Sequence, residues 1–169
     1  MATLSQAAQE SEQIAKCRLA ETILRRFGML RLKVTGCSML PSIWPGDILL
    51  IHRQDIRQVI PGTIVLFSRE GKLIAHRVIC KADDSDNPCV VTRGDSLPSP
   101  DSPVTASELL GKIASVFHSG EWIEPRVRLG LGARLMVALL SHCSLGTRVL
   151  LRLYATRQCQ ENQEALVAR

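Results

Sequence analysis

A chain of 169 residues is long enough to bury the core of one domain and to carry a terminal appendage. Hydrophobic residues make up 46% of it and charged residues 22%, a balance that excludes an intrinsically disordered chain. The formal net charge of +5 is a mild basic bias, but only 4% of the residues are aromatic and no DNA- or RNA-binding signature is visible, so we expect no nucleic-acid partner.

The N-terminal sequence lacks the features of an export signal. Residues 1–17 carry Gln, Glu and Ser where a signal peptide needs a basic start and an apolar centre. The longest apolar stretch, residues 129–153, is divided by Arg134, His142 and Arg148, so it offers no clear membrane-spanning helix, which needs roughly 18 apolar residues in a row. We therefore expect a protein that is cytoplasmic or peripheral to the membrane.

Six cysteines are scattered along the chain, and none forms a Cys-x-x-Cys pair. This distribution argues against a zinc site and a dense disulfide framework, and it suits a reducing compartment. A bridge between Cys80 and Cys89, across a predicted hairpin, stays open. His52, His118 and His142 show no metal-ligand spacing, so we expect no metal and no other cofactor.

Residues 3–27 are predicted to form an amphipathic helix that ends at Gly28, and we assign residues 1–28 to this element. Its apolar residues recur near helical spacing, and they are Leu4, Ala7, Ala8, Ile14, Ala15, Leu19, Ile23 and Phe27. Two roles are open: the helix caps the domain that follows, or it binds a partner.

Residues 29–124 are predicted to form a mainly β domain. From Met29 apolar and polar residues alternate, the pattern of a half-buried strand. Further short apolar runs are separated by Gly and Pro turns, and they lie at 48–51, 63–67, 73–80, 89–92, 109–117 and 122–123. A loop at 95–103 contains three prolines and three serines. This pattern predicts a small antiparallel, coiled β barrel or sandwich.

Residues 125–169 are predicted to form a basic, apolar appendage, a helical hairpin with helices at 127–141 and 147–157. Its arginines have no acidic residue among them, and they are Arg126, Arg128, Arg134, Arg148, Arg152 and Arg157. Two placements are open. The hairpin docks on the β domain, or residues 126–157 make peripheral contact with a membrane surface, where headgroups accept the arginines.

A rigid connection between two of the predicted strands contains Ser38. It reads Gly36-x-Ser38-Met39-x-Pro41 and continues through Gly46-Asp47 into an aliphatic run. Prolines and glycine keep such a backbone irregular, so it can hold one hydroxyl in a fixed place. A serine in a turn is by itself usually only a turn residue.

Three segments in this order resemble the signal peptidase I superfamily. They are the Ser38 segment, Leu73-Ile74-Ala75-His76-Arg77-Val78-Ile79, and Val91-Thr92-Arg93-Gly94-Asp95 continuing to Asp101. The resemblance covers roughly residues 30–115. It implies a serine peptidase with a small coiled β fold and a site along one edge. The chain departs from the signal peptidases in lacking their usual transmembrane anchor.

The resemblance makes Ser38 the nucleophile and His76 its general base. A serine hydroxyl needs such a base to become reactive at neutral pH. Taken alone, a histidine on the apolar face of Ile74 and Val78 is usually a packed core residue. Bacterial signal peptidases and self-cleaving repressor-type peptidases use lysine here, whereas the archaeal and endoplasmic-reticulum type use histidine. Lys72 lies four residues earlier and is a poor substitute.

Asp95 and Asp101 reproduce the spacing of two aspartates in the histidine-type relatives. A carboxylate next to imidazole fixes its tautomer and stabilises the imidazolium. By position Asp101 is expected to be the third catalytic member, and Asp95 to hold the loop or support the site. A turn-capping role is open for either aspartate.

The resemblance also implies how the substrate is held. The N–H of Ser38 is expected to stabilise the oxyanion. Some relatives add a hydroxyl two residues before the serine, but Gly36 stands there, which leaves main-chain stabilisation with Thr35 nearby. Met39 and Pro41 are expected to bind substrate, in a shallow apolar pocket for small side chains.

Three functions follow from these observations. The first is a serine endopeptidase that cleaves a polypeptide substrate, a precursor or partner protein, through a Ser-His-Asp acyl-enzyme. The second is an autoproteolytic, repressor-type peptidase, with small-residue bonds such as Gly132–Ala133 as targets. The third is a non-catalytic β module that binds a partner or a membrane surface.

Overall fold

The computed structural model describes residues 2–82 and 87–127. The predicted C-terminal hairpin, and with it nearly all of the segment expected to contact a membrane, lies outside these residues. Within the described ranges, no helix has both the length and the apolar character needed to cross a bilayer.

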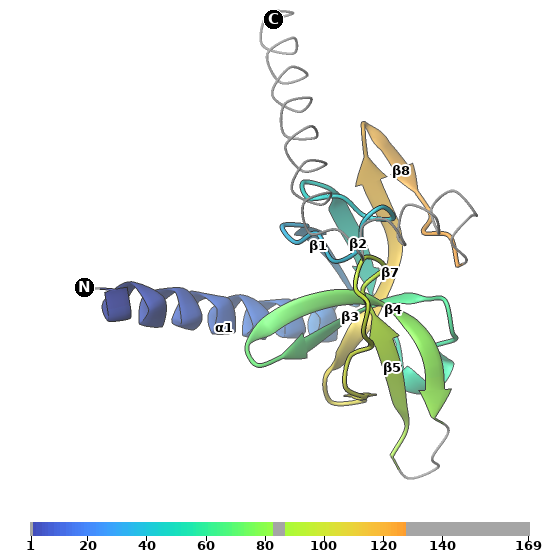
Figure 1. The fold of residues 1–169 in the computed structure, drawn as a ribbon, viewed down its shortest axis with the longest axis horizontal. Coiled ribbons are helices and arrows are strands. Elements are labelled where there is room, and N and C mark those ends of the chain that lie inside the picture. Colours follow the sequence, from blue (N-terminus) through green and yellow to red (C-terminus); the bar gives the residue numbers. More distant parts are fainter. Residues whose placement is uncertain (1, 83–86, 128–169) are drawn as a thin grey trace, which may run out of the picture.

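One twisted antiparallel sheet makes up most of the described chain, and a long helix lies beside it (Figure 1). The elements are α1 (Ala2–Phe27), β1 (Met29–Lys33), β2 (Ile48–His52), the 3₁₀ helix η1 (Ile56–Gln58), β3 (Ile64–Arg69), β4 (Lys72–Ala82), β5 (Cys89–Arg93), β6 (Val104–Thr105), β7 (Leu109–His118) and β8 (Glu121–Ile123). The strand order is β1-β2-β7-β3-β4-β5-β6, and β8 pairs with β7. The predicted mainly β fold with an N-terminal helix is confirmed.

The sheet bends at three places where the register between neighbouring strands shifts. These shifts lie at Leu50/Ile51, Leu66/Phe67 and Val78/Cys80. An extra residue in one strand of a pair bends that strand and increases its twist. The bends curl the sheet, although β1 and β6 remain at opposite ends of the strand order. Because β8 pairs only with β7, it extends the sheet and does not close it.

The core consists of two apolar clusters that share β3. Ile64 and Leu66 belong to one cluster, whereas Val65 and Phe67 belong to the other. All four side chains are at most 2% exposed. A strand covered on both faces needs a continuous apolar run instead of an alternating one, which is what this segment provides. β3 therefore lies at the centre of the domain.

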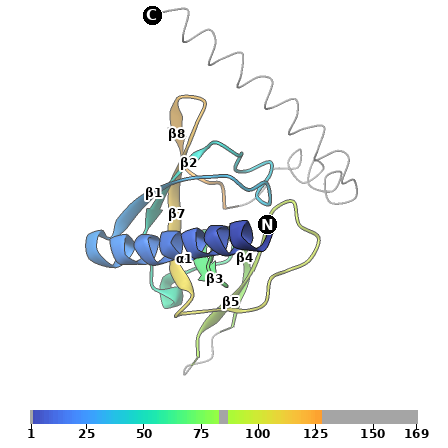
Figure 2. The ribbon, with the colours of Figure 1, turned by 90° about the vertical axis from the view of Figure 1, so that its left-hand side faces the viewer.

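The helix α1 lies across the sheet and contacts β1, β4 and β7 (Figure 2). Its buried stripe is Cys17, Ala20 and Leu24, each at most 7% exposed. Leu19 and Phe27, which we expected on the apolar face, are 60% and 66% exposed, so that part of the prediction is wrong. Two residues of the contact stripe, Cys17 and Ala20, have small side chains, which allow the helix to approach the sheet closely.

Two turns have the backbone conformations that their sequences predict. Gly28 has φ 74° and its N–H donates to Leu24 O, which ends α1. Glu70 and Gly71 have φ of 51° and 71° and join β3 to β4. Two consecutive left-handed residues match the twist of a two-residue hairpin. The predicted helix stop and hairpin turn are both confirmed.

The four cysteines in the described part of the chain carry free thiols. In the β4–β5 pair, Cys80 lies opposite Val91, and Cys89 lies opposite Ala82. The two cysteines are therefore not cross-strand neighbours, and the bridge that the sequence left open is absent.

We predict that Leu24→Ala lowers the free energy of unfolding by about 2–5 kcal/mol, because it opens a cavity beneath α1. Leu19→Ala on the same helix should change it by less than about 0.5 kcal/mol, since that side chain is exposed. Chemical denaturation of both variants measures the difference. Equal effects would contradict the docking of α1 through its Leu24 stripe.

Candidate active site

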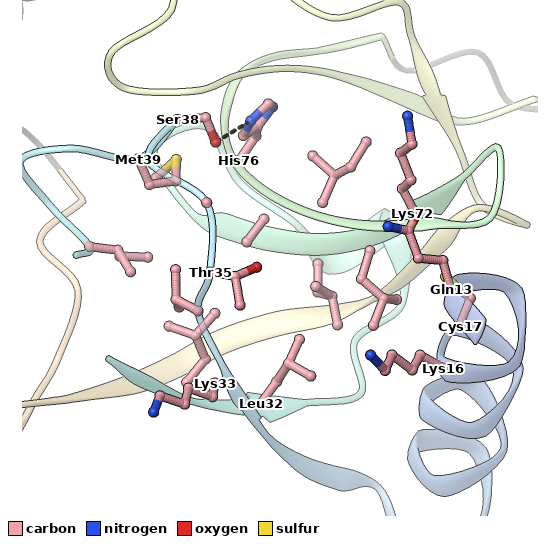
Figure 3. A pocket seen from close by; sticks show the side chains of 18 of the residues that line it. Gln13, Lys16, Cys17, Leu32, Lys33, Thr35, Ser38, Met39, Lys72 and His76 are labelled. Atoms are coloured by element: carbon pink, nitrogen blue, oxygen red, sulfur yellow. Dashed lines mark hydrogen bonds between the residues drawn. The ribbon is translucent and has the colours of Figure 1, made fainter. Parts of the chain in front are cut away.

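Three side chains from separate segments meet at one place. Ser38 follows β1, His76 is in β4, and Asp101 lies between β5 and β6. His76 Nδ1 lies 2.7 Å from Asp101 Oδ2. His76 Nε2 lies 3.0 Å from Ser38 Oγ, the contact that Figure 3 shows as a dashed line. Because a carboxylate only accepts hydrogen bonds, Nδ1 carries the ring proton, and Nε2 accepts the Ser38 hydroxyl.

Buried apolar neighbours fix the turn that presents Ser38. Met39, Leu40 and Ile43 are at most 3% exposed. Hydrogen bonds from Leu40 N to Cys37 O and from Ile43 N to Met39 O close the turn. The chain is thus anchored in the core directly after Ser38, while the Ser38 hydroxyl stays at the edge of the core.

Packing fixes the His76 ring, which is 5% exposed. Phe67 makes an edge contact with it, at 6.1 Å between ring centroids. Phe67, Ile74 and Val78 belong to one apolar cluster, so His76 shares the face of Ile74 and Val78 as the sequence predicted. A ring held in this way keeps the direction of both nitrogens.

Asp101 is held by Thr92 as well as by His76. The Asp101 N–H donates to Thr92 O at 2.8 Å, and Thr92 Oγ1 donates to Asp101 Oδ2 at 2.6 Å. Thr92 is fully buried. We assigned no role to Thr92 from the sequence, although a threonine directly after two valines and two residues before Gly94 was a usable signal. The Pro/Ser loop therefore holds the Asp101 carboxylate beside the His76 ring.

Asp95 lies in a different network. Its two oxygens accept from Arg77 Nε and Arg77 Nη2, each at 2.8 Å, and one of them also accepts from Ser42 Oγ. Arg77 further donates to the main-chain oxygens of Gly62 and Arg126. The carboxylate pairs with Arg77 and not with His76. Of the roles considered for Asp95, holding the loop is the one that this placement fits, and a catalytic contact is not.

The backbone of the Gly-Asp segment touches the site itself. A Cβ atom at Gly94 would lie 2.7 Å from Ser38 O and 3.0 Å from His76 Nε2, closer than such atoms pack. Ser96 donates from N and from Oγ to Ser38 O, at 3.0 and 2.9 Å. Glycine is therefore required here for close approach, and Ser96 clamps the nucleophile's main chain. We predicted neither role from the sequence.

Arg69, at the end of β3, anchors the far side of the Asp101 loop. It donates to Ser102 O and Pro103 O and forms two hydrogen bonds with the Glu108 carboxylate. Hydrogen bonding to Arg69 lowers the pKa of Glu108 from the ordinary value of 4.5 to about 2. The same pair raises the pKa of Arg69. An ion pair thus restrains the loop that carries Asp101.

A pocket of about 690 Å³ opens beside Ser38 and His76. Its floor is apolar and includes Leu32, Val34, Met39, Ile43, Leu49, Leu66, Leu73 and Ala75. Met39 thus lies where substrate binding was predicted. Pro41, the other residue of that prediction, does not line this pocket. Three residues of α1 also line it, Gln13, Lys16 and Cys17, and we did not expect the helix there.

We predict that Glu108→Gln lowers the free energy of unfolding near neutral pH, because it removes the charge partner of Arg69. A carboxylate with a depressed pKa stabilises the fold above its unfolded pKa, and this stabilisation disappears as the pH falls through the folded pKa. The difference between wild type and variant should therefore shrink between pH 4.5 and pH 2. Urea denaturation over this range measures it.

Glu12→Gln is the matched control for this experiment. Glu12 pairs with Lys16 on the surface of α1, where both side chains are more than 60% exposed. An exposed pair contributes little to stability. An equal effect in both variants would contradict a special role for the Arg69–Glu108 pair.

Comparison with models of known protein families identifies the family of this chain. The Peptidase S24-like family matches residues 2–87, just over half of the chain. The match includes Ser38 and His76 and ends before Asp101. No curated protein matches the chain. This family lies in the superfamily that contains self-cleaving repressors and signal peptidase I, so the predicted superfamily is confirmed at that level. The chain belongs to the Peptidase S24-like family of serine peptidases.

Proposed function

We propose that this chain is a serine endopeptidase that cleaves a polypeptide in trans through a Ser38-His76-Asp101 mechanism. The observation that carries the proposal is the continuous hydrogen-bond chain from Asp101 through His76 to Ser38, at 2.7 and 3.0 Å, at one end of an open pocket. In this respect the chain resembles the histidine-type signal peptidases more than their lysine-using relatives. Lys72 lies farther from Ser38 than His76 does (Figure 3).

The proposed chemistry needs only groups of this chain and water. His76 Nε2 takes the Ser38 hydroxyl proton as Oγ attacks the peptide carbonyl carbon. Asp101 holds Nδ1–H and stabilises the imidazolium that forms. His76 then gives the proton to the leaving amine, and the C–N bond breaks. Water, deprotonated by His76, hydrolyses the ester and restores the Ser38 hydroxyl.

The oxyanion needs a hydrogen-bond donor close to Ser38. Among the described residues, the Ser38 N–H has no hydrogen-bond acceptor. A free main-chain N–H next to the nucleophile is available to the developing negative charge. With Gly36 in place of a hydroxyl residue, the main chain supplies this donor, and Thr35 lines the pocket nearby.

An unpaired edge of β4 faces the pocket. Val78 exchanges main-chain hydrogen bonds with the segment before β3, on the β3 side of β4. Because neighbouring residues of a strand point their main-chain groups to opposite sides, Leu73 and Ala75 direct theirs to the other edge. There β5 pairs with β4 only from Arg77 onward. The edge next to Leu73 and Ala75 is therefore free of a strand.

A second unpaired edge belongs to β1, the terminal strand of the sheet. Val34 donates to Asp47 O and accepts from Gly46 N, so its main-chain groups point to β2. By the same alternation, Lys33 and Thr35 point theirs to the open edge. An extended polypeptide can pair with either edge through main-chain hydrogen bonds, whatever its sequence. Apolar side chains of the pocket floor then select small residues near the cut.

Three variants test the proposal. Ser38→Ala and His76→Ala should lower kcat/KM by at least about 10⁴-fold, and Asp101→Asn by about 10³–10⁴-fold, because these groups act as a unit. Cleavage of an unfolded protein followed by mass spectrometry, and labelling with a fluorophosphonate probe, measure the loss. Ser107→Ala, at an exposed serine in the turn before β7, should keep full activity.

Circular dichroism checks that each variant is folded. Cleavage retained in folded Ser38→Ala would overturn the proposal. A wild-type protein that neither cleaves nor reacts with the probe would favour the non-catalytic β module instead.

A second candidate function is autoproteolysis, which the family match supports because the superfamily contains self-cleaving repressors. The Gly132–Ala133 bond considered above lies outside the described residues. Autoproteolysis within one chain predicts two fragments that appear at a rate independent of protein concentration, and none in Ser38→Ala. Intact-mass measurement during prolonged incubation tests this. An unchanged mass in an active wild-type protein would exclude it.

The cellular placement stays a prediction from the sequence. A cytoplasmic or membrane-peripheral peptidase that processes a precursor or a partner protein is consistent with this proposal. Contact of residues 126–157 with a membrane surface is a separate proposal, and vesicle co-sedimentation of the full chain with and without anionic lipid tests it.

A further inference from the structure

An exposed leucine lies beside the catalytic pair. Leu97 directly follows the Gly94-Asp95-Ser96 segment and lines the pocket that contains Ser38 and His76. Among the large apolar side chains that line this pocket in the described chain, Leu97 is the most exposed, at 37%. Apolar surface that is left in contact with water gains free energy when a ligand covers it. Leu97 therefore offers such a surface to a substrate.

Close packing around Gly94 gives the position of the Leu97 side chain. A Cβ atom at Gly94 would lie 3.0 Å from Leu97 Cδ1 and 3.0 Å from His76 Nε2. Because both distances start from the same point, the Leu97 methyl carbon lies no more than 6.0 Å from that nitrogen. His76 Nε2 is the atom that faces the Ser38 hydroxyl. Leu97 thus borders the space in which the peptide bond breaks.

The main chain holds Leu97 in this position although its side chain is exposed. Its N–H donates to Gly94 O at 3.0 Å, which closes a turn. Ser96, one residue earlier, donates from N and from Oγ to Ser38 O. Pro98 follows directly and restricts the backbone of Leu97. A group that is ordered before the substrate arrives loses little conformational freedom when it makes a contact.

The direction of proton transfer identifies the substrate residue that Leu97 meets. In the proposed mechanism His76 Nε2 gives its proton to the leaving amine, so the amine nitrogen comes within hydrogen-bond distance of Nε2, roughly 3 Å. This nitrogen belongs to the first residue after the cut, whose side chain begins only two bonds away. That side chain and the Leu97 methyl group therefore lie close to the same imidazole nitrogen.

We propose that Leu97 contacts the side chain of the first residue after the cut and makes the enzyme favour an apolar residue there. This inference rests on the proposed peptidase activity and adds a specificity-determining residue on the leaving-group side. The apolar floor of the pocket, which strands β1 to β4 provide, is a separate determinant. Because burial of apolar surface drives the contact, the preference should follow the apolar area of the substrate side chain.

The test uses a peptide library derived from a proteome, digested by the full chain and sequenced by mass spectrometry. The expected result is a severalfold enrichment of Leu, Ile, Met and Phe at the first position after the cut. For one peptide from this set, kcat/KM should exceed that of its Ser analogue at this position by about 3–10-fold, because a contact on one side discriminates less than an enclosed apolar pocket.

Two variants of Leu97 and one control locate the effect. Leu97→Ala should remove the preference for an apolar residue and leave kcat/KM on the Ser analogue unchanged. Leu97→Met keeps an apolar side chain of similar size and should keep the preference. Leu19→Ala is the matched control, because Leu19 is a 60% exposed leucine of α1 that does not line the pocket. That variant should keep the preference as well.

The outcomes separate this inference from the proposed function. Cleavage that depends on Ser38 but shows no apolar enrichment after the cut, or an enrichment that persists in folded Leu97→Ala, would overturn the inference alone. An equal loss of kcat/KM on both peptides in Leu97→Ala would assign Leu97 to support of the loop and not to substrate contact, which also overturns it. Absence of any Ser38-dependent cleavage would overturn both proposals.

Discussion

The buried ion pair between Arg77 and Asp95 is the interaction on which the site depends. Two parallel hydrogen bonds join the side chains, and the same network reaches Ser42 in the turn after Ser38. Removing one partner of such a pair leaves a charge in the core, at a cost of about 3–5 kcal/mol. Arg77 also directly follows His76. One guanidinium therefore ties together the segments that carry the nucleophile, the base and the aspartate loop.

Around this network, one of the three candidate catalytic groups lies on a strand and two lie on loops. β4 gives His76 a rigid position, while Ser38 and Asp101 lie on irregular segments that would move if left alone. Buried side chains after Ser38, the Thr92 hydroxyl and the Arg69–Glu108 pair remove that freedom. Groups held before the substrate arrives need no reorganisation during the reaction. Beside these groups, the free edges of β1 and β4 leave main-chain hydrogen-bonding groups open to the pocket.

Local patterns predicted the strands, because alternation and turn residues act over a few neighbours, and the resemblance to the superfamily supplied the order of the site segments. The run from Ile64 to Phe67 and the Glu70-Gly71 turn are of this kind. Contacts between distant segments could not be read in this way. Spacing alone did not decide between Asp95 and Asp101, since the choice depends on which one meets Arg77 and which meets Thr92. β6 escaped detection because two residues show no period.

The helix α1 shows the same limit, because its sequence pattern did not predict which of its residues pack on the sheet. Its buried stripe, Cys17, Ala20 and Leu24, fixes α1 to the sheet, while Gln13 and Lys16 contribute to the pocket without supporting the fold. Cys17 lines the pocket as well, whereas Ala20 and Leu24 only dock the helix on the sheet. Substitutions at the exposed positions 13 and 16 can therefore reshape one wall of the pocket without loosening the helix from the sheet.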